Sequence, residues 1–236
     1  MRSDQSSNLA TRAVTVLFIF NHRCYKTHYW YDDCPKGAKY IVIYRDPCAA
    51  FYSNFNYLQG WFFQPGEVTM EDFASGFDHT SGKAKNEMVN VPYNEHLLSW
   101  WKHRNDPNVL FLFFEEMKQD LESVVKVVAS FMGINDKEKI QTAVQMSSFE
   151  FMKASGTKFD ENLLFLYRNK ACGLPEDARG NKIASGSNSI ALRLLSEKVK
   201  EKIEKKWRET VTATFGFQTY DELRIAFRKE NPLVKH

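Results

Sequence analysis

Two short apolar runs along the chain have the pattern of strands that are buried on both faces. Lys39–Tyr44 and Val109–Phe114 are nearly continuous in apolar side chains instead of alternating with polar ones, and both are rich in β-branched or aromatic residues. Strands of this kind are typical of a parallel sheet that helices cover on both faces. The pattern therefore predicts an α/β fold with a parallel sheet flanked by helices.

Helical periodicity and capping residues follow the predicted strands. Asp46 is a suitable N-cap and Pro47 a suitable first helical residue, directly after the first strand. Residues 60–85 contain several glycines and many aromatic side chains, which indicates a long loop with one short helix. Further helices are predicted from Pro47 toward Leu58, over Tyr93–His103, from Leu121 to Phe131 and from Ser196 to Val211.

Composition narrows the class of protein without indicating an activity. The 236 residues carry 32 basic and 29 acidic side chains, and the net charge of +3 is too small to indicate a nucleic-acid coat. The apolar run Ala13–Phe20 is much shorter than the roughly 20 residues that a spanning helix needs. We therefore expect no nucleic-acid partner and no membrane partner, and the sequence does not indicate the oligomeric state.

The cysteine pattern indicates the cellular compartment of the protein, and the lack of linkers indicates its number of domains. The four cysteines show neither a CxxC pair nor a repeated spacing, so we interpret them as free thiols of a cytoplasmic protein and expect no metal site. No Pro- or Gly-rich linker follows residue 24. We expect an atypical N-terminal segment over residues 1–24 and one domain over residues 25–230.

The position at which the first predicted strand ends is a candidate phosphate site. Arg45 lies at the carboxyl end of this strand, where open parallel sheets bind their ligands. The helix that follows would offer backbone N–H groups, and the guanidinium adds a planar fork of donors. Ser53 lies about two helical turns later, so both side chains can hold one phosphate monoester. An arginine at a strand end is also commonly a surface residue, and that interpretation stays open.

A second candidate site precedes the same strand. Lys26-Thr27-His28 combines a lysine, which can neutralise charge on an anionic group during its transfer, with a histidine, which can act as a general base near neutral pH. A histidine beside a lysine is more often a structural feature of a loop. The spacing alone does not decide between the two interpretations.

Together with their surroundings, these residues resemble the cytosolic sulfotransferase family. The resemblance follows the chain in order from around Lys26 to around Phe227 and is most specific in its first half. The stretches that carry it are Lys26-Thr27-His28, Cys34 to Pro47, Ser53-Asn54-Phe55, Trp100-Trp101-Lys102, Asn108 to Lys118 and Ser147 to Lys153.

The resemblance implies a P-loop-NTPase-like fold and transfer of a sulfuryl group from 3′-phosphoadenylyl sulfate (PAPS) to a small-molecule alcohol, phenol or amine. It implies that His28 takes the proton from the acceptor hydroxyl and that Lys26 stabilises the sulfuryl group. Arg45 and Ser53 would hold the 3′-phosphate. The further nucleotide-binding residues that it implies are Ser147 and Phe149 at the adenine, Phe114, Lys182 and Gly186.

The sequence also departs from the family pattern. The family has an upstream Pro-Lys-Ser-Gly-Thr loop that binds the 5′-phosphosulfate, and none of the 25 residues before Lys26 resembles it. We therefore expect a sheet that is incomplete at the N-terminus. Phe114 stands where many members have a tyrosine. The segment Lys182–Gly186 retains the glycine of an Arg-Lys-Gly-like segment and lacks its arginine, for which Lys182 and Arg179 are the candidate substitutes.

Three interpretations of the activity stay open on the sequence. The chain is a shortened sulfotransferase with impaired activity, a short chain that still catalyses transfer, or a relative that only binds the nucleotide or serves as an interaction module. The loop Gly60–Lys85 lies in the region that gates the acceptor pocket of the family, and its aromatic side chains favour an apolar alcohol or phenol. Packing of these side chains on the core explains them equally well.

Overall fold

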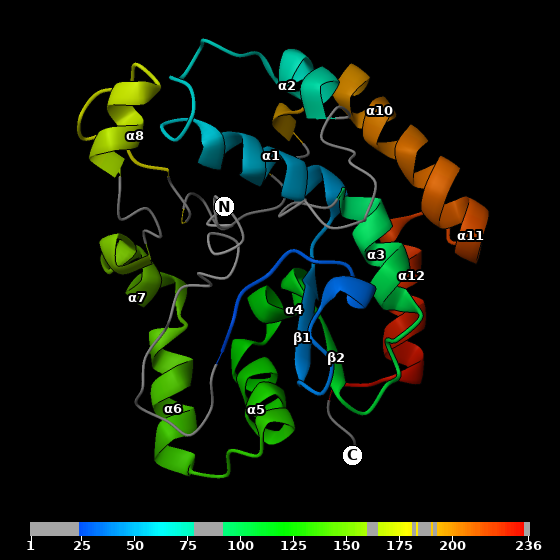
Figure 1. Cartoon of the computed structure of the whole chain (residues 1–236). Coiled ribbons are helices and arrows are strands. Elements are labelled where there is room, and N and C mark those ends of the chain that lie inside the picture. The colour runs from blue at the N-terminus through cyan, green and yellow to red at the C-terminus, as the bar shows by residue number, and fades with distance from the viewer. Residues whose placement is uncertain are drawn as a thin grey trace, which may run out of the picture.

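The computed structural model describes residues 24–77, 92–159, 165–180, 183, 190 and 193–233 of the chain. Within these residues both predicted strands are present, as β1 (Tyr40–Tyr44) and β2 (Val109–Phe113), and they pair in parallel. Tyr44 lies opposite Phe113 in this pairing. The predicted parallel sheet is therefore confirmed, and the carboxyl ends of both strands lie at one edge of it (Figure 1).

The first helix after β1 begins where its capping residues predict. α1 (Pro47–Leu58) begins after Asp46, whose carboxylate accepts a hydrogen bond from the Ala49 N–H at 2.8 Å. α2 (Met70–Phe77) matches the short helix that we expected in the loop after α1. These elements therefore follow from local sequence alone.

Between β2 and the predicted helix Leu121–Phe131 the chain forms a short helix that the sequence patterns do not predict. α3 (Tyr93–Trp101) ends two residues before its predicted end. After β2 the chain enters α4 (Phe114–Gln119) directly, and Asp120 then caps α5 (Leu121–Met132). Gly133 ends α5 with a φ of 78°, which glycine adopts without strain.

The described residues of the C-terminal half form helices joined by turns and contain no strand. The predicted helix after Ser196 is present, and the Ser196 hydroxyl accepts the Val199 N–H at 3.4 Å. The last helix of the chain has no counterpart among the predicted helices. The remaining elements are η1 (Tyr31–Asp33), α6 (Lys137–Met146), α7 (Phe149–Ala154), η3 (Gly156–Phe159), α8 (Phe165–Ala171), α10 (Glu197–Trp207), the π-helical turn η4 (Arg208–Thr212), α11 (Ala213–Phe215) and α12 (Tyr220–Glu230).

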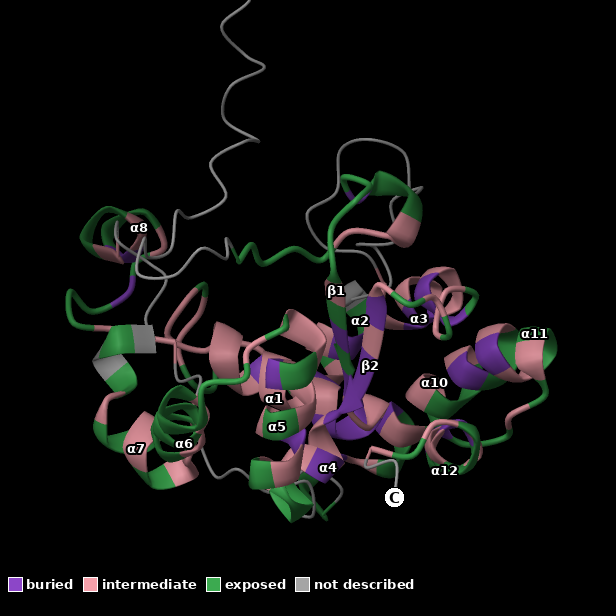
Figure 2. Cartoon of the chain, turned by 90° about the horizontal axis from the view of Figure 1, so that it is seen from below, coloured by how far each residue is buried: buried purple, intermediate pink, exposed green. Residues whose placement is uncertain are grey.

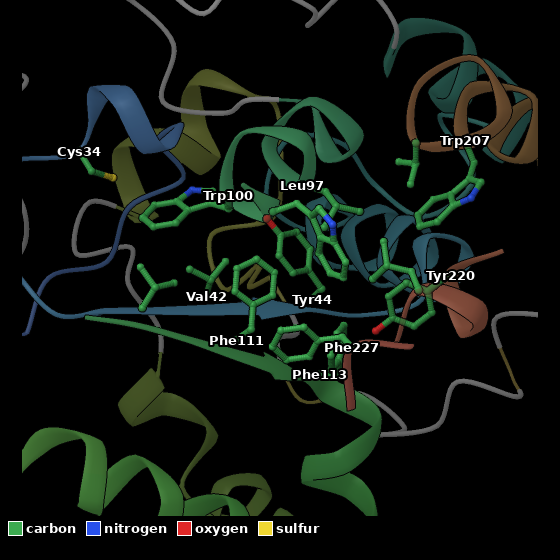
Figure 3. Close-up of a cluster of buried hydrophobic side chains, with 14 residues drawn as sticks. Cys34, Val42, Tyr44, Leu97, Trp100, Phe111, Phe113, Trp207, Tyr220 and Phe227 are labelled. Carbon is green, nitrogen blue, oxygen red and sulfur yellow. The ribbon is translucent and has the colours of Figure 1, made fainter. Parts of the chain in front are cut away.

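One face of the sheet packs against α3 and α12 and forms the main hydrophobic core (Figures 2 and 3). Val42 and Tyr44 of β1 belong to it together with Phe111 and Phe113 of β2. The Phe227 ring of α12 lies 5.6 Å from the Phe111 ring and 5.8 Å from the Phe113 ring, centroid to centroid. The other buried members are Cys34, Leu97, Trp100, Trp101, Val109, Trp207, Val211, Tyr220 and Leu223.

The opposite face of the sheet is covered unevenly by the described residues. Ile41 and Ile43 of β1 are 38% and 53% exposed, whereas Leu112 of β2 is 1% exposed. α5 lies on this side of the sheet (Figure 1), and the Lys39 ammonium donates to the Phe131 carbonyl at 2.6 Å. Helices therefore flank the sheet on both sides, as expected, and cover β2 more completely than β1.

The packing of α12 generates a stability prediction. We expect Leu223→Ala to lower the free energy of unfolding by about 2–5 kcal/mol, because the side chain is fully buried and its removal leaves a cavity. Ile225 lies on the same helix and is 61% exposed, and Ile225→Ala should change the free energy of unfolding by about 0.5 kcal/mol or less. Urea denaturation followed by circular dichroism measures both. Equal losses would contradict the assigned buried face of α12.

Candidate functional site

The carboxyl edge of the sheet brings together two residues that we predicted to bind a nucleotide. Arg45 directly follows β1 and Phe114 directly follows β2. Because Tyr44 lies opposite Phe113, the residues that follow them are neighbours in space. The guanidinium carbon of Arg45 lies 4.5 Å from the centroid of the Phe114 ring, which is a cation–π contact.

Hydrogen bonds from three helices hold the turn that carries Arg45. Glu115 of α4 accepts the Asp46 N–H with one carboxylate oxygen at 3.0 Å. Its other carboxylate oxygen accepts the Tyr220 hydroxyl of α12 at 2.7 Å. The Tyr93 hydroxyl of α3 donates to the carbonyl of Arg45 at 2.8 Å. The backbone at the end of β1 is therefore fixed before any ligand binds.

Arg45 presents a partly desolvated positive charge at this edge. Burial lowers the pKa of its guanidinium, and the negative charges of Glu115 and Asp46 oppose that effect. An arginine stays charged through such a change, because its ordinary pKa lies above about 12. A charge that has lost part of its water attracts an anion more strongly than a fully hydrated one does.

The first amides of α1 are less available to an anion than the sequence suggests. The Asp46 carboxylate accepts the Ala49 N–H at 2.8 Å and also a hydrogen bond from the backbone of Cys48. Pro47 has no N–H to offer. Because the N-cap already occupies these donors, an anion at this turn would depend mainly on the guanidinium of Arg45.

A second cationic group lies one turn along α4. Lys118 follows Phe114 by four residues, so both side chains lie on the same face of α4. Its ammonium lies 5.1 Å from the centroid of the Phe149 ring, and the Lys153 ammonium lies 5.7 Å from the same centroid. Ser147, which we predicted beside Phe149, is exposed at the end of α6. We missed Lys118 in the sequence, although its spacing from Phe114 is a signal that could have indicated it.

The Lys26-Thr27-His28 segment precedes η1 without regular secondary structure, and its side chains are exposed. The Thr27 hydroxyl accepts the Tyr29 N–H at 3.1 Å. Burial lowers the pKa of His96 on α3 to about 4, and the charge of His28 is a second cause of that shift. His28 therefore lies close to α3 and presents its imidazole to solvent.

The other predicted residues are on α1 or beyond the described part of the chain. Ser53 lies half-buried in the middle of α1. Lys182 and Gly186 lie outside the described residues. The segment shortly before them packs against the C-terminal end of α1, since a Cβ at Gly60 would lie 2.7 Å from the Arg179 carbonyl oxygen.

The described part of the chain shows neither a metal cluster nor a membrane span. Among its residues, no group of three or more His, Cys, Asp or Glu side chains is placed to hold a metal ion. No helix within the same ranges has the length and apolar character needed to cross a bilayer.

Comparison with known proteins points to one family. The family model of the sulfotransferase domain matches residues 8–170. Luciferin sulfotransferase of Photinus pyralis is 32% identical over 142 residues, which cover 56% of this chain and 35% of the relative. Amine sulfotransferase of Oryctolagus cuniculus is 31% identical over 137 residues, which cover 56% of this chain and 44% of the relative. The matched segment is less than half the length of either relative.

Solved structures share the fold. The crystal structure of mouse sulfotransferase SULT7A1 complexed with PAP superposes with a TM-score of 0.62 at 25% identity, over 85% of this chain and 68% of that chain. Retinol dehydratase in complex with androsterone and inactive cofactor PAP superposes with a TM-score of 0.54 at 23% identity, over 74% of this chain and 48% of that chain. The fold is therefore the α/β sulfotransferase fold. The family model matches more than half of the residues of this chain, and the chain therefore belongs to the sulfotransferase family.

Proposed function

We propose that the protein transfers a sulfuryl group from PAPS to a hydroxyl or an amine of a small-molecule acceptor. The observation that carries the proposal is the contact between Arg45 and Phe114 at the carboxyl edge of two parallel strands. Open α/β sheets bind their ligands at this edge. The similar mouse protein is complexed with PAP, the nucleotide that remains when PAPS gives up its sulfuryl group.

The proposed nucleotide site extends from the β1–α1 turn toward α7. The guanidinium of Arg45 offers its fork of donors to the 3′-phosphate, and Ser53 adds a hydroxyl from α1. Phe149 supplies a flat face for the adenine, and Ser147 lies two residues earlier. The ammonium of Lys118 adds positive charge between these two ends of the site. Further proposed nucleotide ligands are Phe114, Lys182 and Gly186.

The proposed chemistry uses a general base and a positive charge. His28 takes the proton of the acceptor hydroxyl while the acceptor oxygen forms its bond to the sulfur of PAPS. The bond from that sulfur to the phosphate oxygen breaks, and its electron pair leaves with PAP. Lys26 lies two residues before His28 and offsets the negative charge on the sulfuryl oxygens. The exposure of both side chains supports these roles, because an acceptor can reach them.

The described aromatic side chains after α1 pack on that helix. The Phe55 ring of α1 lies 5.8 Å from the Phe63 ring and 5.4 Å from the Phe73 ring, centroid to centroid. These contacts favour the interpretation in which the aromatic side chains of the loop pack on the core. The aromatic content of the loop therefore does not indicate an apolar acceptor. We propose that the acceptor is an alcohol, a phenol or an amine, because two of the similar proteins are a luciferin sulfotransferase and an amine sulfotransferase. A cytoplasmic location is proposed because Cytosolic sulfotransferase 16 of Arabidopsis thaliana, 28% identical over 187 residues, also matches.

Removing the guanidinium tests the nucleotide site. We expect Arg45→Ala to weaken PAP binding at least about tenfold, which corresponds to about 1.4 kcal/mol. Calorimetric titration of the purified chain with PAP measures the affinity. Arg208→Ala is the matched control, since it removes the same charge from an exposed position on η4 and should leave the Kd unchanged. Equal affinities of the wild type and Arg45→Ala would contradict the proposed site.

Removing the base tests the chemistry separately from binding. We expect His28→Ala to lower kcat for transfer from PAPS by about 10²–10⁴-fold, because no group then takes the acceptor proton. Its affinity for PAP should stay that of the wild type. Single-turnover assays with a panel of phenols, alcohols and amines measure the rate. A chain that binds PAP and transfers to no acceptor would instead support a relative that only binds the nucleotide.

A further inference from the structure

The proposed base, His28, lies on a segment without regular secondary structure, so contacts with other elements must hold its backbone in place. Residues 24–30 form neither helix nor strand, and the His28 side chain is exposed. A general base contributes only when its nitrogen comes within hydrogen-bond reach of the proton it abstracts. The contacts that hold the backbone next to His28 therefore decide how well the base can act.

Side chains of α3 hold the backbone just after the proposed base. Trp100 donates its indole N–H to the Tyr29 carbonyl at 3.0 Å, and the His96 ring makes a second hydrogen bond with the Tyr29 backbone. The Ser99 hydroxyl accepts the Tyr31 N–H at 3.3 Å. Because His96 and Trp100 lie four residues apart, they occupy the same face of α3 and meet the same carbonyl.

The same histidine also contacts the end of β1. The Tyr44 hydroxyl lies 2.8 Å from Nδ1 of His96, and Tyr44 immediately precedes Arg45. Burial raises the pKa of Tyr44 well above its usual value, so the hydroxyl keeps its proton and donates it to Nδ1. A carbonyl can only accept, so the ring nitrogen that meets Tyr29 carries the imidazole proton. One neutral ring thus bridges two segments.

We infer that His96 is a positioning residue for the proposed transfer. Its imidazole joins Tyr44, at the carboxyl end of β1, to the backbone of Tyr29. In this way it sets the distance between His28 and the nucleotide at Arg45. The inference rests on the proposed function. His96 is not a catalytic residue in this account, because it acts through the backbone that carries the base.

Burial favours a neutral imidazole in the bridge. The pKa of His96 is lowered to about 4: burial is the larger cause and the nearby charge of His28 the smaller one, while the hydrogen bond with the Tyr29 backbone opposes both. The titratable groups that face the ring are His28 from the N-terminal segment and Tyr44 from β1. A proton on Nδ1 would force the Tyr44 hydroxyl to turn from donor to acceptor and would leave a charge in a buried place, so the neutral ring is the favoured form of the bridge.

The pH dependence of stability gives one readout of the bridge. The pKa of His96 is about 4 in the folded chain and about 6.5 in an unfolded one, so the unfolded chain binds the proton first as the pH falls. The stabilisation is therefore complete above about pH 6.5 and is lost as the pH falls through about 4. We expect the thermal midpoint to fall more steeply over this range in the wild type than in His96→Gln. Parallel curves would overturn the neutral bridge.

Kinetics test the positioning role. His96→Phe keeps a ring in the core and removes both hydrogen bonds, and we expect kcat to fall about 10–100-fold through misplacement of His28. The KM for PAPS and the Kd for PAP should stay unchanged, because Tyr93 still holds the Arg45 carbonyl. His96→Gln, whose amide offers one donor and one acceptor, should restore most of kcat. A kcat of His96→Phe within twofold of the wild type overturns the inference.

A control variant and an exchange measurement separate this inference from the proposed function. His103→Phe keeps a ring against Tyr31, loses the 2.8 Å contact with Asp106 and should leave kcat unchanged. Hydrogen exchange of the Tyr29 and Tyr31 amides needs no turnover, and it should be faster in His96→Phe and close to the wild-type rate in His96→Gln. Unchanged exchange in His96→Phe overturns the bridge even in a chain that transfers no sulfuryl group.

Discussion

The pairing of Tyr44 with Phe113 is the constraint on which the rest of the site depends. It places Arg45 beside Phe114, and from these two neighbours the chain turns into α1 and α4. A slip of one residue in a strand would turn every side chain of that strand to the other face of the sheet. Tyr44 would then leave the core and Arg45 would lose its partner, so the register of two short strands determines the site.

The hydrophobic core and the polar contacts of the site use the same helices. On α3, Leu97 is fully buried against the sheet while Tyr93 and His96 bond to the β1 end and the N-terminal segment. On α12, Leu223 is fully buried while the Tyr220 hydroxyl donates to Glu115. Apolar burial thus supplies the free energy that fixes these helices against the sheet. The fixed helices in turn determine where their polar side chains lie.

A feature could be predicted from the sequence when it depends on residues that are neighbours along the chain, and could not when it depends on residues far apart in the sequence. The two strands and the Asp46 cap were predictable, because apolar runs and caps act through neighbouring residues. Arg45 was predictable as a candidate for the same reason, since it ends a strand. The contact of Lys118 with Phe149 and the bridge through His96 were not, because each depends on segments that packing brings together from distant parts of the chain. A helical pattern shows which residues share a face, and only the fold shows what that face meets.

A crystal structure of the chain with bound PAP would test the central claim most directly. The account predicts the 3′-phosphate within about 2.7–3.2 Å of the Arg45 guanidinium, at the carboxyl edge of β1 and β2, with the adenine against Phe149. PAP bound at another place, with Arg45 in contact with Phe114 alone, would contradict it.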